Sequence, residues 1–345
     1  MRISTSCSMK RNKDSNTKKM VIIAVTALLL TVMVAVNMMY GSATISFREI
    51  IKALSEKDSA DFAYRIIVYL RLPRIVAAIA AGAALAVAGG VLQSVLNNAL
   101  ASPNIIGVNA GSGLFVVLIT AFFPTHLTMI PFAAFAGALI VALLIYFTAY
   151  KTGASRITIV LAGLAVGSFF GAAIDAVLTL KPDVMISVNS FMVGGFSAVN
   201  FDVVRFALFY IVIGLILAMV LSREMNVISL GDEVAASLGV RVHLFRFVLI
   251  VCASLLAGSA VSFAGLLGFI GLIVPHMCRS MIGHDNRFVL PFSALAGALF
   301  VLTCDLIART AFAPYELPVG IIMSAIGGPF FIYLLFKQRR GRLYD

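Results

Sequence analysis

An apolar stretch that follows Arg74 is the feature that most restricts how this chain can fold. It runs for about twenty residues, the length that an α-helix needs to cross the hydrocarbon core of a bilayer. Alanine and glycine dominate it, and small side chains on most faces of a helix let neighbouring helices approach closely. We therefore predict a transmembrane helix over residues 72–95 that lies at the centre of a bundle and not against lipid.

Apolar stretches of similar length recur along the chain. Of the 345 residues, 61% are hydrophobic and 12% are charged, which is typical of a polytopic membrane protein. The first stretch, Met20 to Tyr40, is too long for the apolar core of a signal peptide, so we interpret it as a span, although Gly41-Ser42-Ala43 leaves a cleaved signal peptide as the alternative. Together with 72–95, the remaining stretches bring the prediction to about ten spans, at residues 104–123, 127–149, 157–180, 203–221, 243–262, 264–278, 288–308 and 317–336.

Lysine and arginine cluster at the two ends of the chain. Residues 1–19 are polar and basic, and a second basic group follows the last predicted span, at Lys337, Arg339, Arg340 and Arg342. Basic residues concentrate on the cytoplasmic side of membrane proteins, so this pattern predicts that both termini are cytoplasmic. We expect an all-α polytopic bundle, with a basic tail over residues 1–19, one transmembrane domain over residues 20–337 and a second basic tail over residues 338–345. The net charge of +11 then needs no nucleic-acid partner.

Motifs for catalysis and for metal binding are missing from the sequence. It lacks G-x-x-x-x-G-K-[ST], so the chain is not expected to hydrolyse ATP. Neither the four histidines nor the four cysteines have the spacing of a metal site. We therefore expect that this chain is not an enzyme and binds no metal or cofactor of its own.

Two aspartates lie within apolar stretches, where a charge costs about 2.5–3.5 kcal/mol. Asp305 precedes Arg309 by four positions, which places both on one helical face and predicts a structural ion pair. Asp175 has no evident partner in the sequence. A proton-coupled carrier that depends on Asp175 is therefore the alternative transport mechanism. Nothing in the sequence favours an intramembrane enzyme, since the two aspartates form no paired-aspartate motif.

Residues 226–240, between the sixth and seventh predicted spans, contain a helix too short to cross a membrane. Ser229 or Asp232 is expected to cap this helix, and Gly239 is expected to end it. An apolar stripe follows along it, made of Leu230, Val234 and Leu238. Such an amphipathic element docks on another surface, either the inner face of the same protein or a cytoplasmic partner.

Three motifs together resemble the FecCD-type permeases, the membrane subunits of bacterial ABC importers for iron-siderophores, haem and cobalamin. The first is R-L-P-R at Arg71–Arg74, followed by G-A-A-L-A, Gln93 and an asparagine turn. The second is L-G-x-x-x-A-x-x-L-G-V within residues 226–240, and the third runs from Gly268 to His276. One departure is Ala99, where the family has proline, and it predicts a looser turn.

The resemblance implies an assembly of two permeases and two cytoplasmic ATPase subunits in the bacterial cytoplasmic membrane, fed by an extracytoplasmic binding protein. The second permease is a copy of this chain or a paralogue, and ATP and Mg²⁺ are used by the ATPase subunits. The implied cargo is an iron chelate, a ferric siderophore first and haem or cobalamin as alternatives.

The resemblance also implies roles for individual residues, position by position. Arg71, Arg74 and Arg309 match the arginines that dock the binding protein, and Asn98 and Leu100 match a cytoplasmic gate. The segment 226–240 matches the loop that couples to the ATPase, through Leu230, Gly231, Asp232, Ala236, Leu238 and Gly239.

Overall fold

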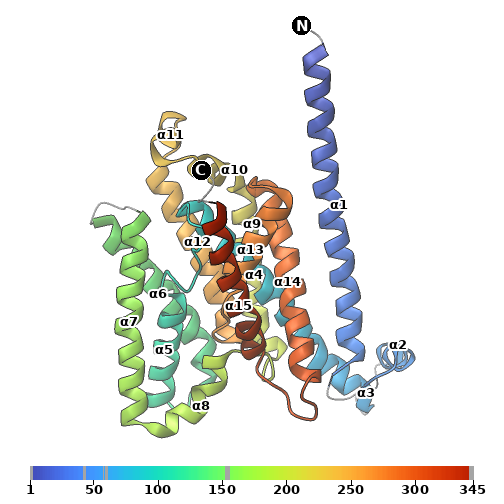
Figure 1. Ribbon diagram of the computed structural model, residues 1–345. Coiled ribbons are helices and arrows are strands. Elements are labelled where there is room, and N and C mark those ends of the chain that lie inside the picture. The colour runs from blue at the N-terminus through green and yellow to red at the C-terminus, as the bar shows by residue number, and fades with distance from the viewer. Residues whose placement is uncertain (1–2, 42–43, 57, 59–60, 152–155, 342–345) are drawn as a thin grey trace.

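The computed structural model describes residues 3–41, 44–56, 58, 61–151 and 156–341. Within them the regular elements are all helices, with no strand (Figure 1). Seven helices are long and apolar enough to cross a membrane. They are α1 (Ile3–Met39, apolar from Asn16), α4 (Leu72–Val95), α6 (Ile130–Lys151), α7 (Arg156–Leu180), α9 (Phe201–Val220), α12 (Val242–Ala264) and α14 (Asn286–Thr310).

Three further helices have shorter apolar segments. They are α5 (Val108–Phe122), α13 (Ile270–Ile282) and α15 (Val319–Gly341, apolar only to Tyr333). Each of the predicted spans therefore coincides with a helix. Length and composition qualify only seven of them, so the count of about ten spans stays a prediction.

The remaining elements are short. Between α1 and α4 lie α2 (Phe47–Glu56), α3 (Phe62–Arg65) and a π-helix, η1 (Ile66–Arg71), which runs directly into α4. A 3₁₀ turn, η2 (Leu127–Met129), leads into α6, and α8 (Pro182–Val193) follows α7. Two short helices precede α12, namely α10 (Ser222–Ile228) and α11 (Asp232–Ser237). The helix α8 was not predicted, because its twelve residues carry no span-length signal.

Two predicted boundaries were wrong. The span predicted over 264–278 begins as a helix only at Ile270, because Gly265 (φ 70°) ends α12 and Phe269 (φ 65°) caps α13, both in the left-handed region. The span predicted from residue 104 begins at Val108, because Gly107 caps α5 with φ 74°. Positive φ values are incompatible with a continuing right-handed helix.

Helix α4 lies at the centre of the bundle and is buried along nearly its whole length, as its small residues predicted. It packs mainly against α14, α12 and α13. A Cβ added to Gly89 would lie 1.8 Å from the carbonyl oxygen of Gly271, and one added to Gly82 would lie 2.3 Å from that of Gly297. Backbones this close exclude any side chain, so these glycines allow the central packing.

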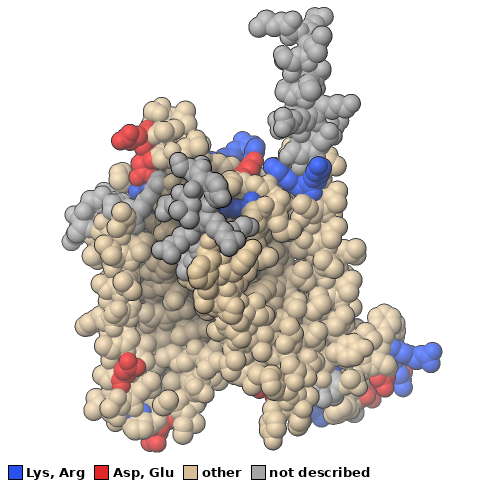
Figure 2. Space-filling model, in the orientation of Figure 1, with Lys and Arg blue, Asp and Glu red and all other residues tan. Residues whose placement is uncertain are grey.

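The two ends of the bundle carry different elements (Figure 1). Helices α10 and α11 lie at one end, where α1 begins and α15 ends, and α2 and α3 lie at the other. Figure 2 shows charged side chains gathered near both ends of this face, with a nearly uncharged band between them. This distribution is that of a multi-pass membrane protein.

Candidate functional site

Three arginines predicted from the sequence meet at the end of the bundle that carries α2 and α3. Arg71 ends η1, Arg74 lies in the first turn of α4, and Arg309 lies in the last turn of α14. Arg74 and Arg309 flank Asp305 on α14, whose side chain is fully buried. Arg74 Nε donates to Asp305 Oδ1 at 3.0 Å, and Arg309 Nε lies 3.2 Å from Asp305 Oδ2.

These arginines also bond to groups around the carboxylate. Arg74 Nη1 lies 2.7 Å from Glu316 Oε2, Arg309 Nη2 donates to Asn37 Oδ1 at 2.5 Å, and Arg71 donates to the carbonyl of Met38. The exposed fractions of the Arg74 and Arg309 side chains are only 12% and 4%. In this conformation the guanidinium groups therefore hold α1, α4 and α14 together, and they present little surface to a partner.

The structure brings Asp305 and Arg309 together as the four-residue spacing predicted, but that spacing missed Arg74. Arg74 and Asp305 are separated by 231 positions. No local pattern connects residues so far apart. The sequence offered one signal for this pair: Arg74 and Asp305 are charged residues at the ends of apolar stretches, and such residues must face protein or water.

Residues 226–240 lie at the opposite end of the bundle. The exposed fractions of Leu230, Val234 and Leu238 are 63%, 46% and 62%. Ala235, between them, is buried, whereas Ala236 is exposed. The predicted apolar stripe therefore faces away from this chain's own bundle, which removes the first of the two docking alternatives for these side chains.

The glycines of this segment set its shape, and the predicted cap was wrong. Gly231 (φ 119°) precedes α11 and Gly239 (φ 82°) follows it, so both need the conformational freedom of glycine. No side chain caps α11 at its start. Ser229 instead bonds to the Asn226 carbonyl, and Asp232 forms a 2.8 Å ion pair with the buried Arg246 of α12, which fixes α11 to the bundle.

The predicted gate residues lie in the turn after α4, at the same end as residues 226–240. Leu100 N donates to Asn98 Oδ1 at 2.9 Å, a side-chain turn that closes without the family's proline at Ala99. Asn98 and Ala99 line a polar cavity of about 460 Å³. Its other walls include His276, Arg279 and Asn286.

Asp175 is exposed on α7. Among the residues that the structure describes, no cation forms an ion pair with it. Large apolar side chains on the same helix are also exposed, namely Ile157, Leu161, Leu164 and Phe169. The helix therefore has a broad face that this chain leaves uncovered.

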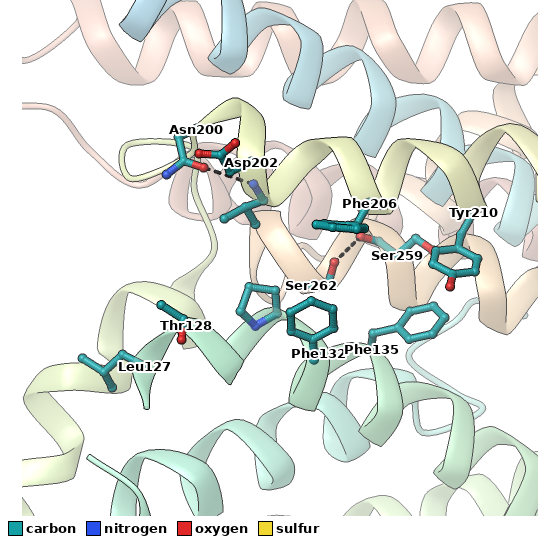
Figure 3. Close-up of a pocket in the computed structure, with 13 residues that line it drawn as sticks. Leu127, Thr128, Phe132, Phe135, Asn200, Asp202, Phe206, Tyr210, Ser259 and Ser262 are labelled. Atoms are coloured by element: carbon teal, nitrogen blue, oxygen red, sulfur yellow. Dashed lines mark hydrogen bonds between the residues drawn. The ribbon is translucent and has the colours of Figure 1, made fainter. Parts of the chain in front are cut away.

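A second cavity, of about 400 Å³, lies between α6, α9 and α12 (Figure 3). Phe132 of α6 approaches Phe206 of α9, with ring centroids 6.1 Å apart, and Phe135 stacks on Tyr210 at 5.2 Å. The hydroxyls of Ser259 and Ser262 at its floor donate to backbone carbonyls and offer no charge. Most of its other lining side chains are apolar, and Asn200 and Asp202 add an amide and a carboxylate.

No group of three or more His, Cys, Asp or Glu side chains within the described ranges could hold a metal ion.

The sequence profile of the FecCD transport family matches residues 28–337. The chain belongs to the FecCD transport family. Among its FecCD relatives, the probable siderophore transport permease YfhA of Bacillus subtilis is 41% identical, over 79% of this chain and 82% of the relative. The Fe(3+)-citrate import permease YfmE of Bacillus subtilis is 36% identical, over 96% and 100%.

A haem permease and a solved transporter structure are also similar to this chain. The hemin transport permease HmuU of Yersinia pestis is 36% identical, over 88% of this chain and 91% of the relative. A solved structure described as a metal-chelate type ABC transporter in an inward-facing conformation superposes with a TM-score of 0.80 at 27% identity, over 92% and 99%. FecCD proteins are permease subunits of ABC transporters, which agrees with the lack of an ATP-binding motif and not with a proton-coupled carrier.

Proposed function

We propose that this chain is the permease subunit of a binding-protein-dependent ABC importer that moves an iron chelate across the bacterial cytoplasmic membrane. ATP hydrolysis, with Mg²⁺, takes place in two partner ATPase subunits. The observation that supports this most directly is the outward-facing apolar stripe of Leu230, Val234 and Leu238, which lies on and beside the short helix α11. An apolar face outside the spans is expected to be covered by a partner.

The topology belongs to the same proposal. With about ten spans, both termini and residues 226–240 face the cytoplasm, where the ATPase subunits bind. In support, α1 begins and α15 ends at the same end of the bundle as α10 and α11. The arginine cluster then faces the other side, where the binding protein delivers its cargo.

Docking of the binding protein is assigned to Arg71, Arg74 and Arg309. Because Arg74 is already bonded to Glu316, whose side chain is 30% exposed, a carboxylate from the binding protein would replace Glu316 on the guanidinium. Such an exchange keeps the buried charge paired throughout, which avoids the cost of an isolated cation.

A second permease, either a copy or a paralogue, is proposed to cover the exposed face of α7. A cavity of about 640 Å³ is lined by residues of α5, α7, α8 and α15, including Asn109, Ile174, Met192 and Ile321. We place the cargo pathway there, between two subunits. Asn98 and Leu100 are proposed to close it at the cytoplasmic end.

The cargo class is an iron chelate, and a ferric siderophore is the first candidate. The relatives are named for siderophores, Fe(3+)-citrate, Fe(3+)-hydroxamate and hemin. Cobalamin remains the further alternative that the family resemblance implied.

The test is uptake of radiolabelled ferric siderophores, ferric citrate, haem and cobalamin by a deletion strain and its complemented counterpart. We expect the deletion strain to lose uptake of one chelate. The intact gene and the Asp175→Asn variant should both restore that uptake, but neither should do so when the partner ATPase lacks its phosphate-binding lysine. Uptake that survives loss of the ATPase and fails in Asp175→Asn would contradict the importer and support the carrier.

A further inference from the structure

Arg279 of α13 is a cation whose hydrogen bonds go to neutral oxygens. Its Nη2 donates to Gly90 O and to Ser94 Oγ, both at 2.9 Å, and its Nη1 donates to Gln93 Oε1. All three acceptors lie in the last two turns of α4. Within the described part of the chain, no carboxylate forms an ion pair with Arg279. A guanidinium at the carboxyl end of a helix interacts favourably with the helix dipole, so Arg279 clamps α13 to the end of α4.

On one side, the clamp connects to residues 226–240. Ser94 Oγ lies 3.0 Å from Asn286 Oδ1 at the start of α14. Asn286 N donates to Asn226 Oδ1 at 2.8 Å, and Asn226 Nδ2 donates to Asp285 Oδ1 at 2.7 Å. Asn226 lies in α10, at the start of the segment that we assign to ATPase coupling.

On the other side, the clamp connects to the turn that carries the gate residues. Gln93 O accepts a hydrogen bond from Asn98 N at 3.1 Å, and Asn98 Oδ1 accepts one from Leu100 N at 2.9 Å. A continuous series of hydrogen bonds and close polar contacts therefore runs from Asn226 through Asn286 and the end of α4 to Leu100. Arg279 joins α13 to the middle of this series.

The surroundings of this series allow it to hold and to release. Gln93, Ser94 and Asn286 are nearly fully buried, with exposed fractions of 4%, 5% and 2%, so their bonds are protected from competing water. The polar cavity of about 460 Å³ lies along them and is lined by all three, by Arg279 and by Asn98. Polar groups that separate there can be hydrated instead of being left unsatisfied.

We propose that Arg279 is a positioning residue that couples movement of residues 226–240 to the gate turn at Asn98–Leu100. The proposal rests on the proposed function and adds the route by which the ATPase reaches the gate. When the partner displaces α10, Asn226 moves the start of α14, and Ser94 carries that movement to the end of α4. Arg279 holds Ser94 and Gln93 in place, so that this movement reaches the turn after α4. The test measures this coupling directly.

The experiment uses the complete importer, reconstituted in liposomes with its ATPase and binding protein. One readout is chelate transported per ATP hydrolysed. The other is labelling of Ala99→Cys, in a Cys7→Ser background, by an impermeant maleimide added at the cytoplasmic side with and without nucleotide. Ala99 is exposed and lines the cavity, whereas Cys252, Cys278 and Cys304 are buried.

We expect Arg279→Gln to assemble and hydrolyse ATP, while transport per ATP falls about five- to tenfold and labelling of Ala99→Cys stops responding to nucleotide. Arg279→Lys should recover part of both. The matched control is Ser280→Ala, which alters a neighbouring wall of the same cavity and leaves the series intact. If Arg279→Gln fails to assemble, Asn226→Ala interrupts the same series at its other end and should show the same uncoupling.

Two results would overturn the proposal. A working parent complex, in which Arg279→Gln and Asn226→Ala keep the parental transport ratio and the nucleotide-dependent labelling, eliminates the coupling role alone. A parent complex without any ATP-dependent transport eliminates the proposed function, and the coupling role with it.

Discussion

Arg74 and Asp305 lie 231 positions apart, and Arg74 Nε donates to Asp305 Oδ1 at 3.0 Å. The same carboxylate lies 3.2 Å from Arg309, so one buried anion serves two cations from two helices. Burying such a group is costly, but removing it from an assembled network costs more, because the cations are then left uncompensated.

Replacing the central anion should therefore destabilise the protein strongly. Asp305→Asn is expected to lower the free energy of unfolding by about 3–5 kcal/mol. The measurement is the thermal unfolding midpoint of the purified protein in detergent. Asp175→Asn is the matched control, because Asp175 is exposed and should leave the midpoint unchanged. Equal midpoints for the two variants would mean that Asp305 does not hold the helices together.

Glu316 tests whether the arginine cluster docks an acidic partner. Its side chain is 30% exposed, so Glu316→Gln should cost less than about 1 kcal/mol of stability. The substitution leaves Arg74 Nη1 without its second carboxylate, and affinity for the binding protein should rise about three- to tenfold at low salt. Surface plasmon resonance, with the importer held in a lipid bilayer, measures the affinity for the binding protein. An unchanged affinity would argue against docking through Arg74.

The glycine contacts of α4 predict a second stability effect. Gly89→Ala places a Cβ 1.8 Å from the Gly271 carbonyl oxygen and should cost about 1–3 kcal/mol or more. Gly171→Ala, on α7, meets nothing within 4 Å and should be neutral or slightly stabilising. Unfolding midpoints of the two alanine variants compare them directly, and a tolerated Gly89→Ala would show that α4 and α13 can separate.

The apolar stripe predicts a loss of partner binding without loss of fold. Leu238 is 62% exposed, so Leu238→Asp should change stability by less than about 0.5 kcal/mol. Association with the ATPase should weaken at least about tenfold, because the substitution puts a charge into an apolar contact. Co-purification at graded ATPase concentrations measures this, with Glu233→Gln as an exposed control on the adjoining helix α11. Parental association of Leu238→Asp would remove the stripe from the interface.

Asp285 predicts a pH dependence. Hydrogen bonds from Arg287 and Asn226 lower the pKa of this carboxylate from 3.8 to about 2. A depressed pKa in the folded state means that the charged form stabilises the fold above the unfolded pKa, and that this contribution is lost as the pH falls from about 4 to about 2. The difference in unfolding midpoint between the parent and Asp285→Asn should be constant from about pH 7 to about pH 5 and shrink below about pH 4. A difference that already shrinks above pH 5 would contradict the assigned cause.

The sequence alone determined the features that depend on local patterns. Span-length apolar stretches predicted the positions of the apolar helices, because each helix must satisfy its own backbone groups within the bilayer. The abundance of Ala and Gly placed residues 72–95 at the centre, and the spacing of Leu230, Val234 and Leu238 predicted their shared face. Apolar length, small-residue content and a shared helical face each depend on residues within a few turns of one another, so the local sequence determines them.

Only the tertiary structure decided which distant groups meet. It placed Arg74 on Asp305 and Glu316, Arg246 on Asp232, and Arg279 on the end of α4. It also showed that the stripe faces away from the bundle, that Arg71 and Arg309 are buried, and that the Arg74 side chain is only 12% exposed. The physical reason is that packing brings these helices together, whereas a charged residue in the sequence has many possible partners and no local pattern that selects one.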